Sequence, residues 1–233
     1  MNIETLQGRR ILLSASLPDE LKGTPRAQGM YDLLVLLSRA LAGAGARLLF
    51  GGHPSVTPLI DRAVAGLGVE REFLCLYQAA HFRHQILEQV ADPSRFPQIH
   101  WIGDEGDDRE AGLTAMRRAM AAEADAAILV GGRGQRPEVC PGLREEYALF
   151  LEAHPQGPLY LLGMLEGEAG RMIAEAEQGQ LAEPNSLSAK ELRLIHHADL
   201  VELVVPLMLA DLGRLLGPHP DALSTATVGS LKA

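Results

Sequence analysis

The sequence has few aromatic residues and only two cysteines. Phe, Trp and Tyr make up 4% of the 233 residues, so Leu, Val, Ile and Ala must fill the core. Cys75 and Cys140 belong to no CxxC motif and have no histidine at a metal-binding spacing, which argues against a disulfide framework and a structural zinc. We therefore expect two reduced thiols, no bound metal and no cofactor.

Basic residues are outnumbered by acidic ones. The chain carries 21 Lys and Arg against 30 Asp and Glu, a formal net charge of -9 at pH 7. Proteins that bind nucleic acid usually have a basic surface and a high isoelectric point. We expect no nucleic-acid partner, and a local basic pocket is the alternative that the overall charge leaves open.

Long uninterrupted apolar runs are also missing. The start, MNIETLQGRRILL, has no apolar stretch preceded by positive charge, so we expect no signal peptide. The most apolar late segment, DLVELVVPLMLADLGRLLG, contains Glu202, Pro206 and Asp211, which argues against a membrane span of about 20 residues. These features are typical of a cytoplasmic protein with no membrane contact.

Short apolar runs alternate with longer segments of helical period, which is the pattern of βαβ units. The predicted strands are RRILLSAS, ARLLFGG, EFLCLYQ, PQIHWIG, DAAILVGG and PLYLLGM. The predicted helices cover about residues 28–42, 55–66, 80–91, 108–123 and 142–153. This order predicts an α/β fold with a Rossmann-like, doubly wound and mainly parallel sheet flanked by helices. Ligands of such folds bind beyond the carboxyl ends of the strands.

No shift in composition marks a domain boundary, so we expect one domain over residues 1–233. Its core should cover about 9–165, followed by a C-terminal helical segment at about 166–217 and a small, polar tail at 218–233. The segment from Ala189 to Leu216 has more Leu and Val than one buried face needs. Because large apolar surfaces usually mark interfaces, we expect a homo-oligomer.

The first two strand ends carry candidate ligand groups. Ser14 and Ser16 end the first predicted strand, where hydroxyls can hold phosphate or ribose oxygens; the alternative is a capped surface loop. Gly51 and Gly52 end the second, where bare backbone allows a tight turn and a close ligand. The alternative there is a purely structural turn.

The helix that follows Gly52 offers further donors. His53 and Thr57 lie at its start, where free backbone N–H groups attract anions. The alternative for His53 is a solvated side chain in a strand-to-helix turn. The sequence alone does not separate the two readings.

The fifth predicted strand repeats the double glycine. It ends in Gly131, Gly132, Arg133 and Gly134, which offer open backbone amides and a guanidinium fork. The run has neither the GK[ST] of a Walker A loop nor the GxGxxG of a dinucleotide fold. An anion or sugar site is therefore predicted without a named cofactor.

Two carboxylates, Glu145 and Glu146, lie in the first turn of the next predicted helix. A carboxylate there can accept two ribose hydroxyls, or it can simply complement the helix dipole. Spacing alone places Arg117 on a helix where most arginines are solvated. The acidic run DEGDDRE is interpreted as a solvated loop, and His196 and His197 as ordinary helix residues.

Five motifs in one order resemble the SLOG superfamily, a Rossmann-like group named for Smf/DprA and the Lonely Guy proteins. They are LLSASLPDE, LLFGGHPSVTPLI, FLCLYQAAHF, LTAMRRAM and AAILVGGRGQRPEVCPGLREEYALFLEAHP, and they cover about residues 9–165. The subgroup that they resemble is often found in bacterial conflict and signalling systems. The resemblance implies binding of a nucleotide-derived molecule in a pocket made by Ser14, Ser16, Gly51, Gly52, His53, Arg117, Gly131, Gly132, Arg133, Gly134 and Glu145 or Glu146.

Lonely Guy enzymes cleave the N-glycosidic bond of nucleoside monophosphates, and their motif places a Pro-Gly-Gly-x-Gly-Thr-x-x-Glu run after a Met and an Arg. Here seven residues separate Gly134 from Gly142, and Val130 and Leu143 replace the Pro and the Thr. This interruption favours ligand binding over catalysis.

The first hypothesis is therefore a ligand sensor that works through oligomerisation or an effector protein. The alternative is a nucleotide N-glycosidase with Glu145, Glu146 and Arg117 as catalytic residues. In either case Lys22, Arg26, Arg117 and Arg133 should converge around the ligand.

Overall fold

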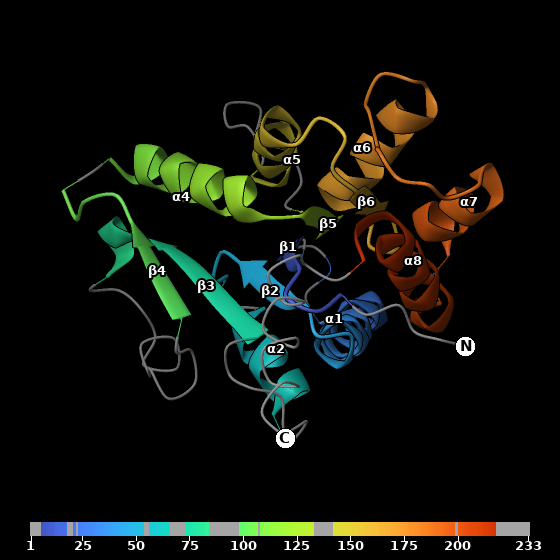
Figure 1. Cartoon of the computed structure of the whole chain (residues 1–233), viewed down its shortest axis with the longest axis horizontal. Helices are drawn as coiled ribbons and strands as arrows, with labels where there is room; N and C mark the ends of the chain where they lie inside the picture. The colour runs from blue at the N-terminus through green and yellow to red at the C-terminus, as the bar shows by residue number, and fades with distance from the viewer. Residues whose placement is uncertain are drawn as a thin grey trace, which may run out of the picture.

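The computed structural model describes residues 6–17, 21, 23–53, 56–65, 73–83, 98–106, 108–132, 142–198 and 200–217. Six strands form one sheet (Figure 1): β1 (Arg10–Ser16), β2 (Arg47–Phe50), β3 (Leu74–Ala79), β4 (Gln98–Ile102), β5 (Ala126–Gly131) and β6 (Leu159–Leu162). Their order is β4-β3-β2-β1-β5-β6, and all neighbours are parallel. The predicted Rossmann-like fold is confirmed, with a fully parallel sheet.

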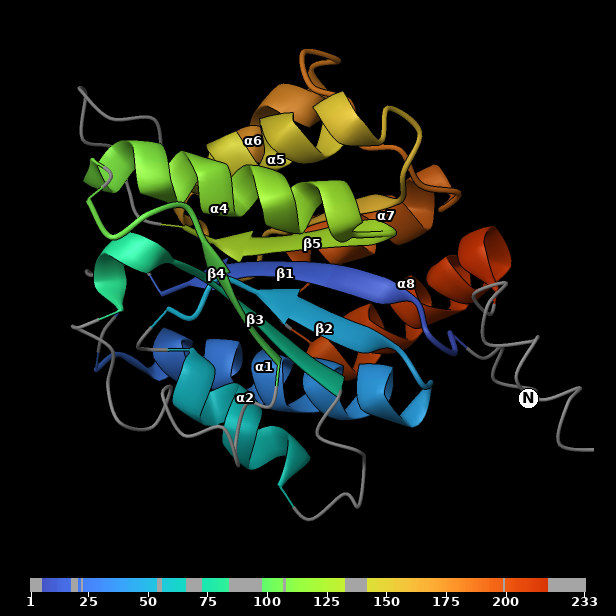
Figure 2. The ribbon, with the colours of Figure 1, turned by 60° about the vertical axis from the view of Figure 1, so that its left-hand side comes forward.

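One face of the sheet is covered by α1 (Pro25–Gly43), α2 (Thr57–Val64) and α8 (Val201–Leu216), as Figure 2 shows. In α1 the five apolar residues at helical spacing are buried: Met30, Leu33, Leu34, Leu37 and Leu41. They pack with alternate residues of the strands, including Ile11, Leu13 and Ile128. Because the odd-numbered residues of β1 face this side, its even-numbered residues face the other.

The opposite face is covered by α4 (Arg109–Glu123), α5 (Gly142–Ala153) and α6 (Gly167–Glu177) (Figure 2). Leu12 of β1 and Leu129 of β5 pack into this second core with Met116, Met120 and Phe150. Helix α7 (Ala189–His197) contacts the edge strand β6 and α8. The two faces therefore have separate apolar cores of Leu, Ile, Val, Ala and Met, as the low aromatic content requires.

The helices differ from prediction mainly at their ends. Those predicted at 28–42, 108–123 and 142–153 match α1, α4 and α5, and the one predicted at 55–66 matches α2. The one predicted at 80–91 is wrong in its described part, where Ala80–Phe82 forms the 3₁₀ turn η3. Residues 84–91 lie outside the described ranges, as does the tail 218–233. Among the described helices, none combines the length and the apolarity needed to cross a bilayer.

The chain reverses its winding between β1 and β5. Strand β1 pairs with both β2 and β5, and it leads into α1 on one face while β5 leads into α5 on the other. The ladder places Ser14 opposite Leu129 and Ser16 opposite Gly131. Connections that leave in opposite directions open a crevice at the carboxyl ends of two such strands.

Candidate functional site

Four predicted site residues converge beside this switch point. Ser14 comes from β1, Arg117 from α4, and Glu145 and Glu146 from the first turns of α5. Ser14 shares with Leu12 the face of β1 that these helices cover. The four side chains form one network of hydrogen bonds and ion pairs, which we call the Arg117 cluster.

Arg117 is held by both glutamates. Its Nη1 donates to Glu145, and its Nε lies 3.8 Å from Oε1 of Glu146. The hydroxyl of Thr114 also donates to Glu145. The side chains of Arg117, Glu145 and Glu146 are only 15%, 21% and 11% exposed, so these ion pairs are better shielded from solvent than ordinary surface pairs.

The first residue of α5 makes room for the guanidinium. A Cβ at Gly142 would lie 2.7 Å from Nη2 of Arg117, so a larger residue would displace the arginine. The positive charge thus lies against a helix N-terminus, whose dipole disfavours cations. Glu145 and Glu146 in the next turn offset that penalty.

Glu146 is the most enclosed acid of the cluster. Burial raises its pKa, and a hydrogen bond from the Ser14 hydroxyl together with the positive charge of Arg117 only partly opposes this rise. The nearby Glu145 carboxylate raises the pKa further. Because two carboxyl groups share one guanidinium, they keep acceptor capacity that a hydrogen-bond donor on a ligand can use.

One N–H donor of Arg117 makes no hydrogen bond to the described residues. Its Nε is buried and finds no hydrogen-bond acceptor within the described part of the chain. Buried donors are rarely left unpaired in folded proteins, and such exceptions call for a specific explanation. An acceptor supplied by a ligand is one such explanation.

The double glycine after β2 has a packing role. Gly52 has φ +61°, and a Cβ there would lie 1.7 Å from Nε2 of Gln78, which donates to the carbonyl of Gly51 at 3.3 Å. A Cβ at Gly51 would approach the Met116 methyl group at 3.2 Å. Gln78 and the helix that bears Arg117 can therefore come close to this turn only because it lacks side chains.

The double glycine at the end of β5, Gly131 and Gly132, also has a packing role. Gly131 and Gly132 have φ +69° and +92°, a region that residues with a Cβ rarely adopt. A Cβ at Gly132 would lie 2.9 Å from Cβ of Glu168, and one at Gly167 would lie 2.6 Å from the carbonyl oxygen of Gly132. The bare backbone lets the start of α6 pack directly on the end of β5.

The remaining predicted groups have local partners or lie outside the description. The buried Thr57 hydroxyl donates to the carbonyl of His53 at 3.0 Å and closes the turn into α2. The carbonyl of Ser16 accepts from the amide of Gly132. Arg133, Gly134 and Lys22 lie outside the described residues, as does the side chain of Arg26.

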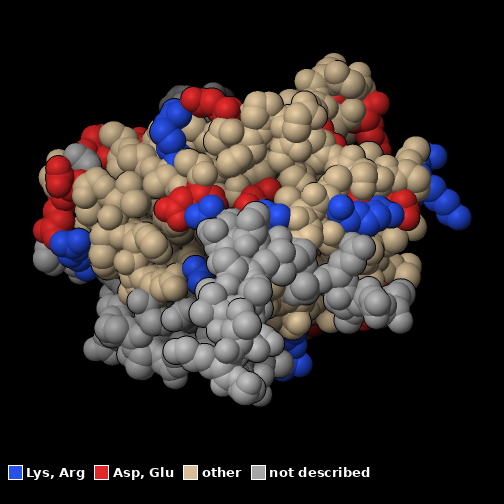
Figure 3. Space-filling model, viewed as in Figure 1, with Lys and Arg blue, Asp and Glu red and all other residues tan. Residues whose placement is uncertain are grey.

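Of the four cations expected to converge, only Arg117 has a side chain among the described residues. Two acids neutralise its charge. On the described part of the face in Figure 3, blue and red residues are interspersed rather than gathered into a basic patch.

Thr114 and Gly142 were not predicted as site residues from the sequence. Thr114 lies three residues before Arg117, so both project from the same side of α4. That spacing was a usable signal. Gly142 stood next to a proline in a loop-like run, and only the packing of Arg117 against it shows why a glycine is needed.

A parallel sheet in this order, with polar groups gathered at its switch point, defines a Rossmann-like protein of the doubly wound class. The chain belongs to the SLOG cluster3 family, whose model matches residues 36–198. The match includes Arg117, Glu145 and Glu146 and begins after Ser14. No curated protein matches the chain significantly.

Two solved structures have similar folds. The X-ray structure of TM1055, a structural genomics target, has a TM-score of 0.54 and 17% identity, and the alignment covers 86% of this chain and 98% of that one. DNA processing protein A from Helicobacter pylori has a TM-score of 0.54 and 14% identity, with 90% of this chain and 83% of that one covered. That structure is described as showing a single-stranded DNA binding mode. At these identities the likeness shows the fold.

Proposed function

We propose that the protein binds a nucleotide-derived small molecule at the carboxyl ends of β1 and β5 and acts as its sensor. The observation that carries this proposal is the Arg117 cluster, which collects a cation, two carboxylates and a hydroxyl beside the switch point. Doubly wound folds bind their ligands at this place. The SLOG cluster3 membership supports the same ligand class.

Each group in the cluster has a chemical use for a nucleotide. Glu145 and Glu146 are acceptors for the paired hydroxyls of a ribose. Arg117 is a donor for phosphate oxygens, and its Nε, which has no hydrogen-bond acceptor among the described residues, is one such donor. A ligand that takes Arg117 from one carboxylate leaves that carboxylate free for the sugar. Ligand entry would thus exchange internal ion pairs for contacts with the ligand.

As a sensor, the protein would pass this exchange on through α4 and α5, because Arg117 and Thr114 join these helices through Glu145. The response would come from a homo-oligomer or an effector protein, in the bacterial cytoplasm and in a signalling or defence setting. Gly51, Gly52, Gly131 and Gly132 would then serve the site by bringing α4 and α6 onto the strand ends.

The test is ligand-dependent stabilisation with a matched pair of arginine variants. We would measure melting temperature and calorimetric affinity with nucleoside monophosphates and dinucleotides. Binding to the native state adds RT ln(1 + [L]/Kd) to its stability. Arg117→Gln should abolish the ligand-induced shift, whereas Arg118→Gln should not, because Arg118 is 57% exposed and pairs with Glu152 on the surface. Equal shifts in both variants would refute the proposal.

A nucleotide N-glycosidase is the second candidate. The observation in its favour is a nearly buried carboxylate beside a guanidinium, which can stabilise an oxocarbenium-like ribosyl centre while the arginine holds phosphate. The same incubations distinguish the two candidates, since release of free base requires turnover. Free base from the wild type, lost in Glu145→Gln or Glu146→Gln, would favour the enzyme.

A nucleic-acid partner is the outcome to exclude in the same experiment. The Helicobacter pylori protein is described with single-stranded DNA, while this chain has a net charge of -9. We expect no shift with a single-stranded oligonucleotide. A shift that falls steeply with salt would indicate phosphate-backbone binding instead.

A further inference from the structure

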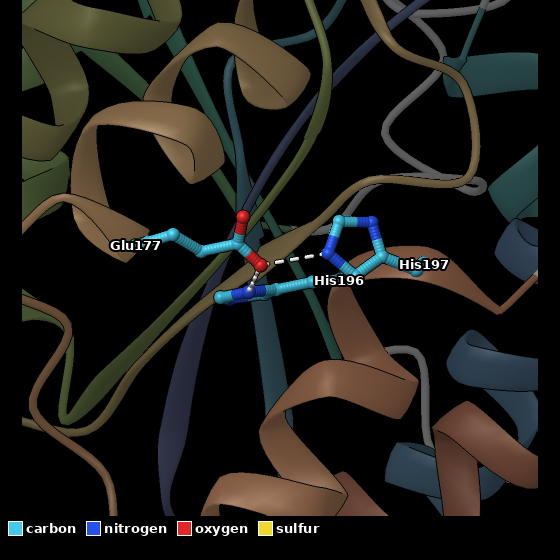
Figure 4. A group of neighbouring side chains, drawn as sticks. All are labelled: Glu177, His196 and His197. Atoms are coloured by element: carbon cyan, nitrogen blue, oxygen red, sulfur yellow. Dashed lines mark hydrogen bonds and ion pairs between the residues drawn. The ribbon is translucent and has the colours of Figure 1, made fainter.

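A cluster of ligating side chains lies far along the chain from the Arg117 cluster. It joins Glu177, the last residue of α6, to His196 and His197, the last two residues of α7. Figure 4 shows the Glu177 carboxylate facing both rings. From the sequence the two histidines were predicted to be ordinary helix residues, but in the structure they share Glu177 as a partner.

The ligand atoms are close enough to share one ion. Nε2 of His197 lies 2.7 Å from Oε1 of Glu177, and Nδ1 of His196 lies 3.6 Å from the same oxygen. One ligand atom from each residue lies within 4.8 Å of the other two. Bonds of about 2.0–2.2 Å in a tetrahedral site put ligand atoms roughly 3.4 Å apart. Small rotations of Glu177 and His197, which are 42% and 56% exposed, reach that spacing.

A second carboxylate orients the buried histidine. Oε2 of Glu183 lies 2.8 Å from Nε2 of His196, and Oε1 of Glu183 accepts the amide of Leu161 in β6. Both side chains are almost fully buried, at 2% and 4% exposure. A histidine that binds a metal usually donates its other ring N–H to such a carboxylate, which fixes the ring and its tautomer. Here that arrangement directs Nδ1 of His196 toward Glu177.

The surroundings favour a divalent cation. The C-terminal ends of α6 and α7 meet at the cluster, and each helix carries about half a negative charge at that end. Glu177 and Glu183 supply two formal negative charges, the amount that balances a divalent ion when both histidines are neutral. A surface depression lined in part by Glu177, Glu183, Arg193 and His196 gives access from solvent. Arg193 is the positively charged residue among those that line this depression.

We propose that Glu177, His196 and His197 bind a divalent transition metal ion of the zinc class. Two imidazoles and one carboxylate suit zinc rather than magnesium or calcium, which prefer oxygen ligands. The ion would take the place of the proton that His197 shares with Glu177 and would tie the ends of α6 and α7 together. Three protein ligands leave one tetrahedral position for water or an external ligand.

The experiment uses the full chain, freed of metal with a chelator and titrated with zinc chloride in a calorimeter. We expect one ion per chain and a melting temperature that rises with zinc concentration. Glu177→Gln and His197→Asn, both at exposed positions, should weaken zinc binding at least about tenfold without unfolding the chain. Glu183→Gln keeps the acceptor for Leu161 and should weaken binding about 10- to 100-fold, as expected for the partner of a metal ligand.

His154→Asn is the matched control, because His154 lies elsewhere and contacts the carbonyl of Ala121. It should bind zinc as the wild type does. The proposal is overturned if the wild type shows no saturable binding, if Glu177→Gln and His197→Asn bind like the wild type, or if His154→Asn loses binding to the same degree. None of these results depends on nucleotide binding.

Discussion

At the scale of single residues, Glu146 is the clearest test of how the Arg117 cluster is built. Burial is the largest cause of its raised pKa, so the folded chain favours the protonated acid more than the unfolded chain does. Ionisation of Glu146 therefore lowers stability as pH rises through its folded pKa. Glu146→Gln removes that cost. We expect the variant to melt at or above the wild-type temperature at pH 7, with the difference vanishing in acid, below the ordinary glutamate pKa.

The comparison for Glu146→Gln is Glu145→Gln, since Glu145 accepts from both Arg117 and Thr114. Loss of that carboxylate removes charged hydrogen bonds, each of which contributes about 1.5–3 kcal/mol to stability if the neighbouring side chains do not rearrange. We expect Glu145→Gln to lower the melting temperature at pH 7. Melting curves from pH 4 to pH 8 measure both effects. A Glu146→Gln variant less stable than Glu145→Gln at pH 7 would contradict this account of the cluster.

The double glycine at the end of β5 leads to a second prediction at the scale of single residues. Gly132→Ala forces an alanine to φ +92° and places its Cβ 2.9 Å from Cβ of Glu168. Gly179→Ala has a similar dihedral problem, with φ +72°, but nothing lies within 4 Å of the added Cβ. The left-handed backbone costs about 1–2 kcal/mol in both variants. Crowding should make Gly132→Ala the less stable by a further 1–3 kcal/mol or so.

Denaturant unfolding of the two glycine variants measures that difference directly. If they lose equal stability, the close approach of α6 to β5 does not account for Gly132. A smaller loss in Gly132→Ala would count against the packing explanation altogether.

At the scale of elements, the buried acid Asp211 links α8 to the sheet through hydrogen bonds. Asp211 is fully buried and accepts hydrogen bonds from the Tyr160 hydroxyl of β6, from the amide and hydroxyl of Ser186, and from Arg214. Burial alone would raise the pKa of Asp211, but these hydrogen bonds outweigh it and lower the pKa. Its contribution is therefore present above the unfolded pKa and is lost as pH falls through the folded pKa.

Asp211→Asn turns one acceptor into a donor that faces other donors. We expect it to cost about 1–3 kcal/mol at pH 7, or roughly 2–4 °C of melting temperature per kcal/mol for a chain of this size. The loss should shrink in acid. Arg214→Gln is the control, because Arg214 is 51% exposed and pairs of that kind contribute about 0–1 kcal/mol. An equal loss in both variants would place the stabilisation in the ion pair instead.

Elements were predictable from sequence wherever the apolar pattern is local. Strands such as β5 are buried on both faces and appear as continuous apolar runs, and α1 shows its buried face as a helical period. Strand ends were less certain, because the ladder decides them. At their carboxyl ends, β2 was predicted two residues too long and β5 one residue too long, because Gly51, Gly52 and Gly132 lie beyond the last paired residues of the ladders.

The site was less predictable than the fold because its contacts are not local. Glycines and acids near strand ends drew attention to Glu145 and Glu146, but the hydrogen bond between Ser14 and Glu146 depends on the pairing of β1 with β5. In the same way, no local pattern brings Glu183 onto β6 or His196 beside Glu177. Such contacts follow from topology, which the sequence implies only through the whole order of elements.

At the scale of the whole molecule, the exposed apolar side chains of the C-terminal segment predict self-association. Leu200, Leu203 and Leu215 are 58%, 48% and 43% exposed on or beside α8, the helix that packs against α1 on the same face of the sheet. Isolated exposed leucines are common, but Leu200 and Leu203 lie one turn apart at the start of α8, and neighbouring exposed apolar side chains are typical of interfaces. Part of the excess of Leu and Val in this segment is therefore exposed on the surface.

We expect a homodimer or larger assembly by light scattering at micromolar concentration. Leu203→Glu places a charge in that surface and should shift the mass toward the monomer, since burying an unpaired carboxylate costs several kcal/mol. Gln178→Glu adds the same charge at an exposed position after α6 and should leave the mass unchanged, which separates the interface from a general effect of net charge. Leu203 also lies on the outer side of α8, so its replacement should leave the melting temperature of the monomer nearly unaltered. A wild-type protein of monomeric mass, or an assembly that Leu203→Glu does not weaken, would show that α8 is not the interface and that its leucines face solvent or another partner.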